Sequence, residues 1–428
     1  MFNIRKTSIL TMVLLSSLLC AQSFAAGSGA FRLEVPDAGA VGKGSAFVGE
    51  ANTPVAVYYN PAGMTLMKKA AISVGASLIQ PKVDYKSNSG DESQMRRGSY
   101  VIPNMFFVQP VGEKFAVGFG AMSSWGLTTS WNPDSFARYN ATKSVMENKD
   151  FLISAAYQLN DQFSFALSLD IDDSHVDKQK KLAQGVGADG NFQLKGDSTG
   201  YGYRIAGLYK LNERHQFGFM YRSTIQHKYK GKITLKDLNN AAGSNMYQAV
   251  FGATDYETDV ISKMVLPDSI VLGYSFKPTS KWTFNADVEW MNWSVVNEEE
   301  LACPSESDPT RNFILAGTPG SNDWQSAISA AVGLQYDITE RFRVRTGYYH
   351  HQAPVPTNNW QANMSDAVSH GVTLGLGYDF TESLTLDLAW SGIYYMKREI
   401  DNTVAGGTIN GTYRQTCNLL YLTATYKF

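Results

Sequence analysis

The sequence predicts an all-β protein, a transmembrane antiparallel β-barrel of about fourteen strands with an N-terminal hatch that plugs its lumen. Three observations support this prediction. Apolar and polar residues alternate from about residue 69 to residue 428, in segments of strand length. The connections between these segments are alternately short and long. Residues 26–68 fit neither the strand pattern nor the helix pattern, so we expect them to form the hatch.

Residues 1–25 have the features of a secretory signal peptide. Arg5 and Lys6 provide a basic start, and the apolar stretch from residue 9 to residue 19 is too short to span a bilayer as a stable helix. Small residues near position 25 suit a cleavage site, so we expect the mature chain to begin at Ala26.

The stretch from Phe163 to Asp172 shows the alternation most clearly. Its large apolar side chains fall on one face of the expected strand, and its small or acidic side chains fall on the other. A soluble β-sandwich also alternates, but it buries its apolar face. Strands of about 9–11 residues with an apolar face of Leu, Phe and Tyr instead suit a lipid bilayer. Because backbone groups in lipid must all be hydrogen-bonded, the sheet has to close.

Six short turns and seven long segments join the expected strands, which gives fourteen strands. Short turns on the periplasmic side and long loops outside are typical of outer-membrane barrels. The last strand alternates and ends in Phe428, which resembles the C-terminal signal of such barrels. We therefore expect the protein to lie in the bacterial outer membrane.

Charged residues on the polar faces of several expected strands should point into the lumen. We expect them to form ion pairs that tether the hatch to the wall; the alternative is that one of them binds a ligand carboxylate. These residues are Arg204, Arg222, Asp287, Glu289, Arg343 and Arg345. Further candidates for a carboxylate lie near the rim of the fifth strand: Lys178, Lys180 and Lys181.

The composition excludes several classes of function. A net charge of −2 offers no basic surface for nucleic acid, and a mean hydropathy of −0.22 excludes a bundle of transmembrane helices. The histidines lie near no clear nucleophile motif and no metal-ligand spacing occurs, so we expect neither an enzyme nor a cofactor. Each barrel can work alone, so we expect a monomer surrounded by outer-membrane lipids and lipopolysaccharide.

Two cysteines, Cys303 and Cys417, remain once the signal peptide is removed. Both fall near the same end of the expected barrel, in or beside outer loops, and the compartment is oxidising. They form either a disulfide or two separate, partly buried thiols, and the sequence leaves both alternatives open.

Six short motifs occur along the mature chain in the order typical of one family of outer-membrane proteins. Through them the chain resembles the FadL-type transporters of long-chain fatty acids and other hydrophobic compounds, which include the TodX-like importers of aromatic hydrocarbons. The motifs are Asn60-Pro61-Ala62, Pro103-Asn104-Met105, Trp125-Gly126-Leu127, Tyr221-Arg222-Ser223, Leu266-Pro267 and Arg345-Thr346-Gly347.

The resemblance implies a route for an apolar ligand. The ligand would first meet an apolar surface among the outer loops and then enter a pocket inside the barrel. It would leave sideways into the membrane through a gap beside a kinked third strand. We therefore expect passive import of hydrophobic small molecules, with long-chain fatty acids as the expected ligands. The alternatives are import of aromatic hydrocarbons within the same family and a general porin, which would need no plug.

Several residues match the binding and gating parts of the family. Phe31 matches a hatch aromatic residue that touches the ligand; the alternative is that it packs as apolar filler. Trp125 closes the third strand. Pro61 cannot continue a β ladder and Asn60 is a natural turn residue, so a corner that includes Ala62 could hold the hatch against the wall. The alternative is an ordinary turn into the first strand.

Two further sites have open alternatives. In the third strand, Gly118 and Gly120 fall on the inward face, where they permit a bend or leave room for a bulky neighbour. In the outer loop 239–252, Met246 and Phe251 share one side of an expected helical turn, as a docking surface or as packing for neighbouring loops. Residues 178–199 should form a short polar loop, where fatty acid transporters of the family have a longer apolar one.

Overall fold

The computed structural model of this 428-residue chain describes residues 29–34, 37–184, 187–238, 250–296, 300–307, 310, 314 and 322–428. The expected signal peptide and Met246 of the expected docking surface lie outside these ranges. Within the ranges, no helix is both long and apolar enough to cross a membrane.

The described part of the chain contains twenty strands in one sheet and a few short helical segments. The strands are β1 (Ala71–Ser87), β2 (Glu92–Gln94), β3 (Tyr100–Val111), β4 (Phe115–Met122), β5 (Gly126–Ser130), β6 (Lys143–Gln158), β7 (Phe163–Leu182), β8 (Gly190–Lys210), β9 (His215–Arg222), β10 (Ile225–Lys236), β11 (Tyr256–Leu266), β12 (Ser269–Phe276), β13 (Trp282–Met291), β14 (Glu300–Ala302), β15 (Ala327–Asp337), β16 (Phe342–His351), β17 (Ser369–Asp379), β18 (Leu384–Tyr395), β19 (Arg398–Ile400) and β20 (Gly411–Lys427). The helical segments are α2 (Ala38–Val41), α3 (Ala56–Tyr59) and the 3₁₀ turns η1 (Pro61–Leu66), η2 (Trp293–Val296), η3 (Thr357–Asn359) and η4 (Val404–Gly407).

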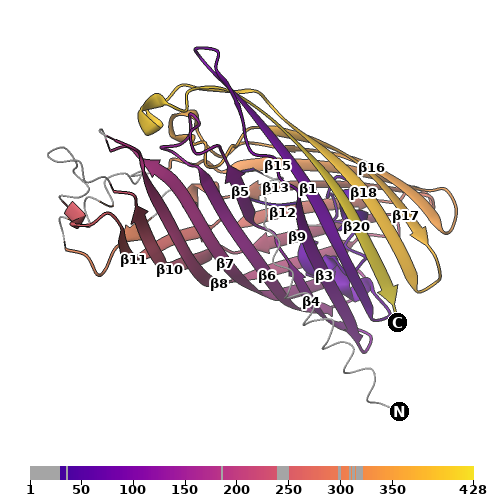
Figure 1. Ribbon diagram of the computed structural model, residues 1–428. Coiled ribbons are helices and arrows are strands. Elements are labelled where there is room, and N and C mark those ends of the chain that lie inside the picture. Colours follow the sequence, from indigo (N-terminus) through magenta and orange to yellow (C-terminus); the bar gives the residue numbers. More distant parts are fainter. Residues whose placement is uncertain are drawn as a thin grey trace.

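The sheet closes into an antiparallel barrel of 14 strands, which confirms the predicted fold (Figure 1). β1 pairs with β3 on one side and with β20 on the other, so the first and last strands of the wall seal the barrel. Several wall strands are interrupted and carry two labels each: β4 with β5, β9 with β10, β11 with β12, and β13 with β14. Short turns lie at the end where the C-terminus lies, and the long connections lie at the other end (Figure 1).

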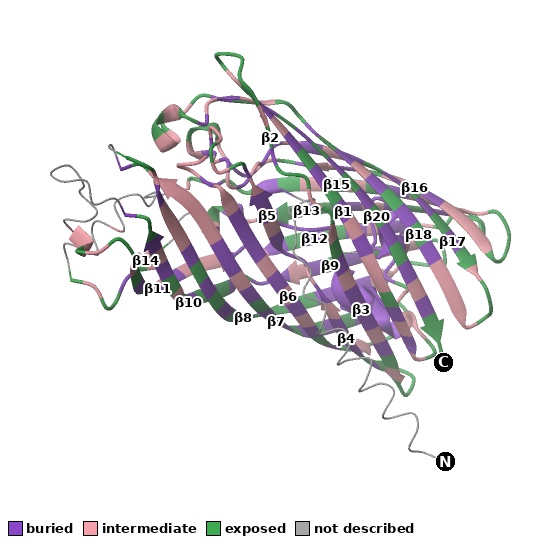
Figure 2. Ribbon diagram, in the orientation of Figure 1, coloured by how far each residue is buried: buried purple, intermediate pink, exposed green. Residues whose placement is uncertain are grey.

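Exposed and buried residues alternate along the strands of the wall (Figure 2). The exposed ones include many large apolar side chains, and the buried ones include many small or polar side chains. In β7, Phe165, Leu167 and Leu169 are exposed, whereas Ala166 and Ser168 between them are buried. Large exposed apolar side chains of this kind recur on strands all around the barrel. Such a surface is stable where lipid, rather than water, covers it.

The N-terminal segment, defined as the described residues 29–34 and 37–67, lies inside the barrel (Figure 1). Two of its short helical segments, α2 and η1, begin at capping side chains. Asp37 Oδ1 accepts a hydrogen bond from Ala40 N (2.8 Å) at the start of α2. Asn60 Oδ1 accepts one from Ala62 N (3.1 Å) at the start of η1, where Pro61 occupies the first position. These caps allow a chain without long helices to keep one conformation in the lumen.

The expectation of a short polar loop over residues 178–199 is wrong. β7 continues to Leu182 and β8 begins at Gly190, so most of this stretch forms a long antiparallel hairpin. The last exposed large apolar residue of β7 is Leu169, and the first of β8 is Tyr201. The strands therefore extend beyond the apolar band, where their polar residues no longer show the alternation that lipid imposes.

The two cysteines are buried thiols that are not joined by a disulfide. Cys417 lies on β20, and Cys303 follows β14. Of the two alternatives that the sequence leaves open, the structure contains the separate thiols. Each occupies an apolar environment, which is common for unoxidised cysteine.

Candidate functional site

A cavity of about 690 Å³ lies inside the barrel, toward the end with the long connections. It is bounded by the inner faces of β6, β7, β8, β10 and β11 and by the loops that follow β16 and β19. Its apolar lining includes Phe31, Leu127, Val145, Met146, Val176, Leu194, Ile233, Phe251, Met264, Trp324 and Met364. A concave apolar site of this size is typical of small-molecule binding.

Polar residues form a smaller part of the lining than apolar residues. Among the described lining residues, Lys178 and Lys180 of β7 are the charged ones. Lys180 is half-buried, and its Nζ lies 5.4 Å from the centre of the Phe192 ring. An ammonium group held beside an aromatic ring and apolar side chains is a suitable partner for a single carboxylate.

Phe31 closes the cavity toward the N-terminal segment. Its side chain is buried, and its ring centre lies 5.8 Å from Trp125, 5.1 Å from Trp293 and 5.8 Å from Trp324. The structure therefore places two residues predicted from the sequence, Phe31 and Trp125, in one aromatic cluster. Phe251 also lines the cavity, on its far side.

The wall is interrupted between β4 and β5, at residues 123–125. β4 pairs with both β3 and β6, but the described hydrogen bonds between β3 and β4 end at the pair Met105–Ala121. β5 pairs with β6 in a register shifted by one residue, because three residues of this strand face two of β6. This insertion is a β-bulge, which bends its strand.

The N-terminal segment takes up the hydrogen-bonding groups that the interruption leaves. Leu33 N donates to Ser124 O (3.0 Å), and Gly126 N donates to Phe31 O (2.9 Å). Arg32 forms an antiparallel bridge with Trp125. Beyond the interruption, Arg96 N donates to Ser130 O (2.8 Å) and rejoins the wall. The third wall strand thus pairs with the N-terminal segment where it would otherwise pair with β3.

Gly118 and Gly120 lie on the inward face of β4, in a stretch that pairs regularly with both neighbouring strands. A Cβ on Gly118 would come within 2.7 Å of Val57, and one on Gly120 within 3.2 Å of Val57 and of Phe106. Of the two roles considered for these glycines, the contacts fit room for bulky neighbours. The bend lies a few residues further along the strand.

The turn at Asn60 joins the N-terminal segment to the wall. Its side-chain Nδ2 donates to Val48 O (2.9 Å) within the segment and to Gly207 O (3.0 Å) of β8. Pro61 and Ala62 follow it in η1, and all three residues are buried. The side chain thus connects two parts of the segment with one wall strand.

Four of the six charged residues predicted to face the lumen contact the N-terminal segment. Asp287 accepts hydrogen bonds from Phe47 N (2.7 Å) and Val48 N (2.9 Å), and Glu289 forms an ion pair with Arg32. Arg204 Nη1 donates to Tyr58 O (3.1 Å), and Arg222 Nη2 donates to Tyr58 Oη (3.4 Å).

The other two charged residues pair within the wall. Arg345 Nη1 lies 2.6 Å from Asp387 Oδ1, and Arg343 pairs with Asp379. None of the six is among the described residues that line the cavity. Their positions fit a tethering and structural role better than contact with a ligand in the cavity.

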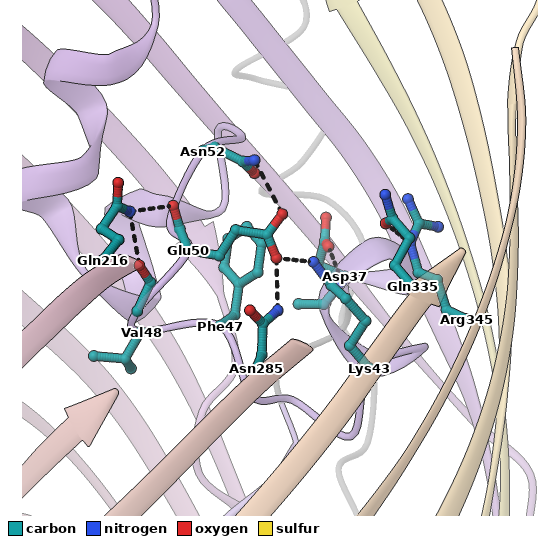
Figure 3. Close-up of polar contacts among 12 residues, drawn as sticks. Asp37, Lys43, Phe47, Val48, Glu50, Asn52, Gln216, Asn285, Gln335 and Arg345 are labelled. Carbon is teal, nitrogen blue, oxygen red and sulfur yellow. Dashed lines mark hydrogen bonds and ion pairs between the residues drawn. The ribbon is translucent and has the colours of Figure 1, made fainter. Parts of the chain in front are cut away.

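A buried ion pair that sequence reasoning missed lies near the short-turn end (Figure 3). Lys43 pairs with Glu50, whose carboxylate also accepts a hydrogen bond from Asn285 Nδ2 (2.6 Å) of β13. Gln216 Nε2 of β9 donates to Gly49 O (2.7 Å). Burial would raise the pKa of Glu50, but Lys43 and Lys277 outweigh it and hold that pKa below its usual value. Gly42 and Gly44, which flank Lys43, could have indicated from the sequence that this residue packs closely against the wall.

The described residues contain no group of three or more His, Cys, Asp or Glu side chains able to hold a metal ion. The arrangement is a mostly apolar cavity whose lining includes two lysines and which lies near an interruption of the wall.

Comparison with known proteins agrees with this geometry. Residues 17–428 match a sequence model of the family described as outer membrane protein transport protein (OMPP1/FadL/TodX). A long-chain fatty acid transport protein of Escherichia coli (strain K12) is 25% identical to the chain, over 89% of this chain and 90% of that protein.

Solved structures share the fold. A Pseudomonas aeruginosa FadL homologue superposes with a TM-score of 0.82 at 19% identity, over 94% of this chain and all of its own. The Pseudomonas putida toluene transporter TodX superposes with a TM-score of 0.68 at 18% identity, over 94% of this chain and 98% of its own. The chain therefore belongs to the OMPP1/FadL/TodX family and is an outer-membrane β-barrel that transports hydrophobic compounds.

Proposed function

We propose that this protein imports long-chain fatty acids passively, through the apolar cavity and out through the interruption between β3 and β5. The observation that carries the proposal is the combination of a large, mostly apolar cavity of about 690 Å³ with two lysine side chains, Lys178 and Lys180, in its lining. An acyl chain fits the lining, and a carboxylate fits Lys180. A single-ring hydrocarbon would fill only part of this volume and would leave the lysines without an anionic partner.

The free energy for uptake comes from partition. Each Å² of apolar surface that leaves water contributes about 25 cal/mol, so an acyl chain is drawn into the cavity without any external energy source. The resemblance to fatty acid transport proteins supports the same ligand class. No pumping is required, because the ligand moves from water to an apolar site and then to lipid.

The exit is proposed at residues 123–125. No backbone hydrogen bond joins residues 123–125 to β3 in the described part of the chain, and residues 31–33 of the N-terminal segment pair there instead. Displacement of this short stretch would connect the cavity floor with the membrane. Phe31 lines the cavity with its ring and pairs with the interruption through its backbone oxygen. A ligand that displaces this ring would therefore also disturb residues 31–33, which cover the exit.

The test for the ligand is uptake of labelled oleate and toluene by cells that produce Lys180→Met. Lys195→Met, an exposed lysine on β8, serves as the matched control. Loss of one ion pair with the carboxylate should lower oleate uptake at limiting concentration about tenfold and leave toluene uptake unchanged. Toluene uptake without oleate uptake in the unaltered protein would overturn the fatty acid proposal.

The test for the exit is deletion of Ser123. Removing one residue from the three that face two of β6 would restore a continuous register and allow β5 to pair beside β3. Oleate uptake should then fall strongly while oleate still binds to the purified barrel. Unchanged uptake would exclude this exit, and uptake of small sugars instead of oleate would favour a porin.

A further inference from the structure

A buried aspartate on β6, Asp150, binds a residue in the interruption between β4 and β5. Asp150 of β6 lies opposite Met122, the last residue of β4. Its Oδ2 accepts hydrogen bonds from Ser124 N (2.6 Å) and from Ser124 Oγ (2.8 Å). Both residues are fully buried. Ser124 O accepts the hydrogen bond from Leu33 N, so this one residue joins the wall to the hatch.

Asp150 faces a second carboxyl group. Asp172 of β7 lies directly opposite it, and the two side chains are within hydrogen-bonding reach of each other. Two buried carboxylates in this position would repel each other strongly. Asp150 Oδ1 and Asp172 Oδ2 have no hydrogen-bond donor among the described residues. One proton shared between the two groups satisfies both oxygens and removes one of the charges.

The groups around the pair fix its other oxygens. Asn148 Nδ2 donates to Asp172 Oδ1 (2.5 Å), and His227 Nε2 of β10 lies 3.2 Å from the same oxygen. The only other carboxylate on this inner face of β7 beside the pair is Asp170, which Arg204 occupies through Nε (3.1 Å) and Nη2 (2.7 Å). Asp150 therefore has one oxygen for Ser124 and one for Asp172.

Arg204 connects this cluster to the hatch. Its Nη1 donates to Tyr58 O, and its guanidinium carbon lies 4.7 Å from the centre of the Tyr58 ring. Arg222 lies over the rings of both Tyr58 and Trp125, at 5.6 and 5.3 Å. The interruption is thus bonded to the hatch on one side. On the other side it is bonded to a set of buried polar side chains that includes Asp150, Asp172 and Arg204.

We infer that Asp150 is a positioning residue for transport: it holds β4 and β5 in their interrupted form by binding both donors of Ser124, and it does so as one half of a carboxyl pair that shares a proton. The consequence for transport rests on the proposed exit at this interruption. A continuous strand would offer these donors to a neighbouring strand, so the bulge needs a partner that takes them.

The test compares Asp150→Ala with Asp150→Asn in the purified full-length protein. The Asn side chain keeps an oxygen for Ser124 and offers an N–H to Asp172, so it reproduces the protonated pair. Hydrogen exchange in peptides that cover residues 119–127 and 29–34 should rise about tenfold in the Ala variant and stay within about twofold of the unaltered protein in the Asn variant. Asp173→Ala is the matched control, because Asp173 is the exposed residue next to Asp172 on β7.

Two results would overturn the inference. Unchanged exchange in Asp150→Ala would show that Ser124 does not depend on this carboxyl group. Equal exchange in the Ala and Asn variants would show that a charged carboxylate, and not a shared proton, is required. Ser124→Ala removes one donor only and should give a smaller rise in the same peptides, so the inference can be tested even where Asp150→Ala does not form a barrel.

Oleate uptake by the same variants separates this inference from the proposed function. Asp150→Ala should lower uptake severalfold, and Asp150→Asn should retain it. Raised exchange with unchanged uptake would overturn the exit route and leave the positioning role of Asp150 supported. Loss of uptake in both variants with unaltered exchange would overturn the positioning role.

Discussion

The two parts of the N-terminal segment are attached to the barrel by different means. Residues 29–33 pair with residues 124–126 through two backbone hydrogen bonds, insert one aromatic ring into a cluster at the cavity floor and form one ion pair with the wall, between Arg32 and Glu289. Residues 37–67 are held by several buried polar contacts with wall residues and by close backbone contact with the wall. The first attachment has fewer contacts, so we expect it to open at a lower free energy than the second.

Glycines in the wall account for the tight fit of the second part. On Gly333 of β15, an added Cβ would lie 2.6 Å from Lys43 Cβ, and on Gly273 of β12 it would lie 2.8 Å from the carbonyl carbon of Val48. Gly218 and Gly347 meet the segment just as closely. One short segment therefore combines an anchor, residues 37–67, with the proposed cover of the exit, residues 29–33.

The anchor should be most sensitive to a change in the wall at Gly333. Gly333→Ala places a methyl group against the backbone of Lys43, and this backbone cannot move away without losing its contacts with the wall. We expect the free energy of unfolding to fall by about 4 kcal/mol, measured by guanidinium titration in lipid vesicles. Gly207→Ala, where an added Cβ would meet one atom at 4.0 Å, is the control and should change little.

The ion pair at Glu50 should come next. Glu50→Gln leaves Lys43 buried without a charged partner and should cost about 3 kcal/mol at neutral pH. Because the pKa of Glu50 is lowered in the folded state, its stabilisation is present above the ordinary value of 4.5 and is lost as pH falls below it. The unaltered protein should therefore lose stability below that pH more steeply than Glu50→Gln. Parallel pH profiles for the two would contradict the pair's role.

Asp287→Ala should have a smaller effect on the same anchor. It leaves the N–H groups of Phe47 and Val48 without their acceptor, at a cost of about 2 kcal/mol. Limited proteolysis should then cut within residues 37–67, whereas the same residues, which are largely buried, should resist cleavage in the unaltered protein. Resistance equal to that of the unaltered protein would show that the other contacts suffice.

Phe31→Ala should affect the cover and leave the anchor intact. Residues 29–33 can unfold locally, so the variant cannot lose more stability than this local opening costs. We expect the free energy of unfolding to fall by about 1 kcal/mol. Hydrogen exchange should rise in residues 29–34 and stay unchanged in residues 37–67. Equal rises in both parts would abolish the distinction between cover and anchor.

The sequence predicts the wall well because lipid and lumen impose opposite demands on successive residues. Where lipid ends, this contrast ends too, and the pattern predicts a loop at residues 178–199 although β7 and β8 continue there. The lumen-facing charges are predictable for the same reason, since a charged residue in mid-strand has to face inward. Phe31 and Trp125 become site residues through the family resemblance.

The rest of the site depends on register between strands, which the chain alone does not encode locally. The interruption at residues 123–125 exists only relative to β6, and Gly118 and Gly120 draw attention to a nearby but regular stretch. Asp150 and Asp172 read as two ordinary polar-face residues until pairing of β6 with β7 places them opposite each other. The role of Gly333 likewise appears only once residue 43 lies against it.

The seat of the N-terminal segment has a consequence for the order of assembly. Ala38 N donates to Thr423 Oγ1 of β20 across 385 residues, and the close glycine contacts come from β9, β12, β15 and β16. Contacts this distant in the chain form slowly, because long loops must close first. The N-terminal segment is synthesised before the strands that bind it, so it completes its contacts last, when the C-terminal strand has joined the sheet. Until then, the wall has to form around a segment that lacks most of its final contacts.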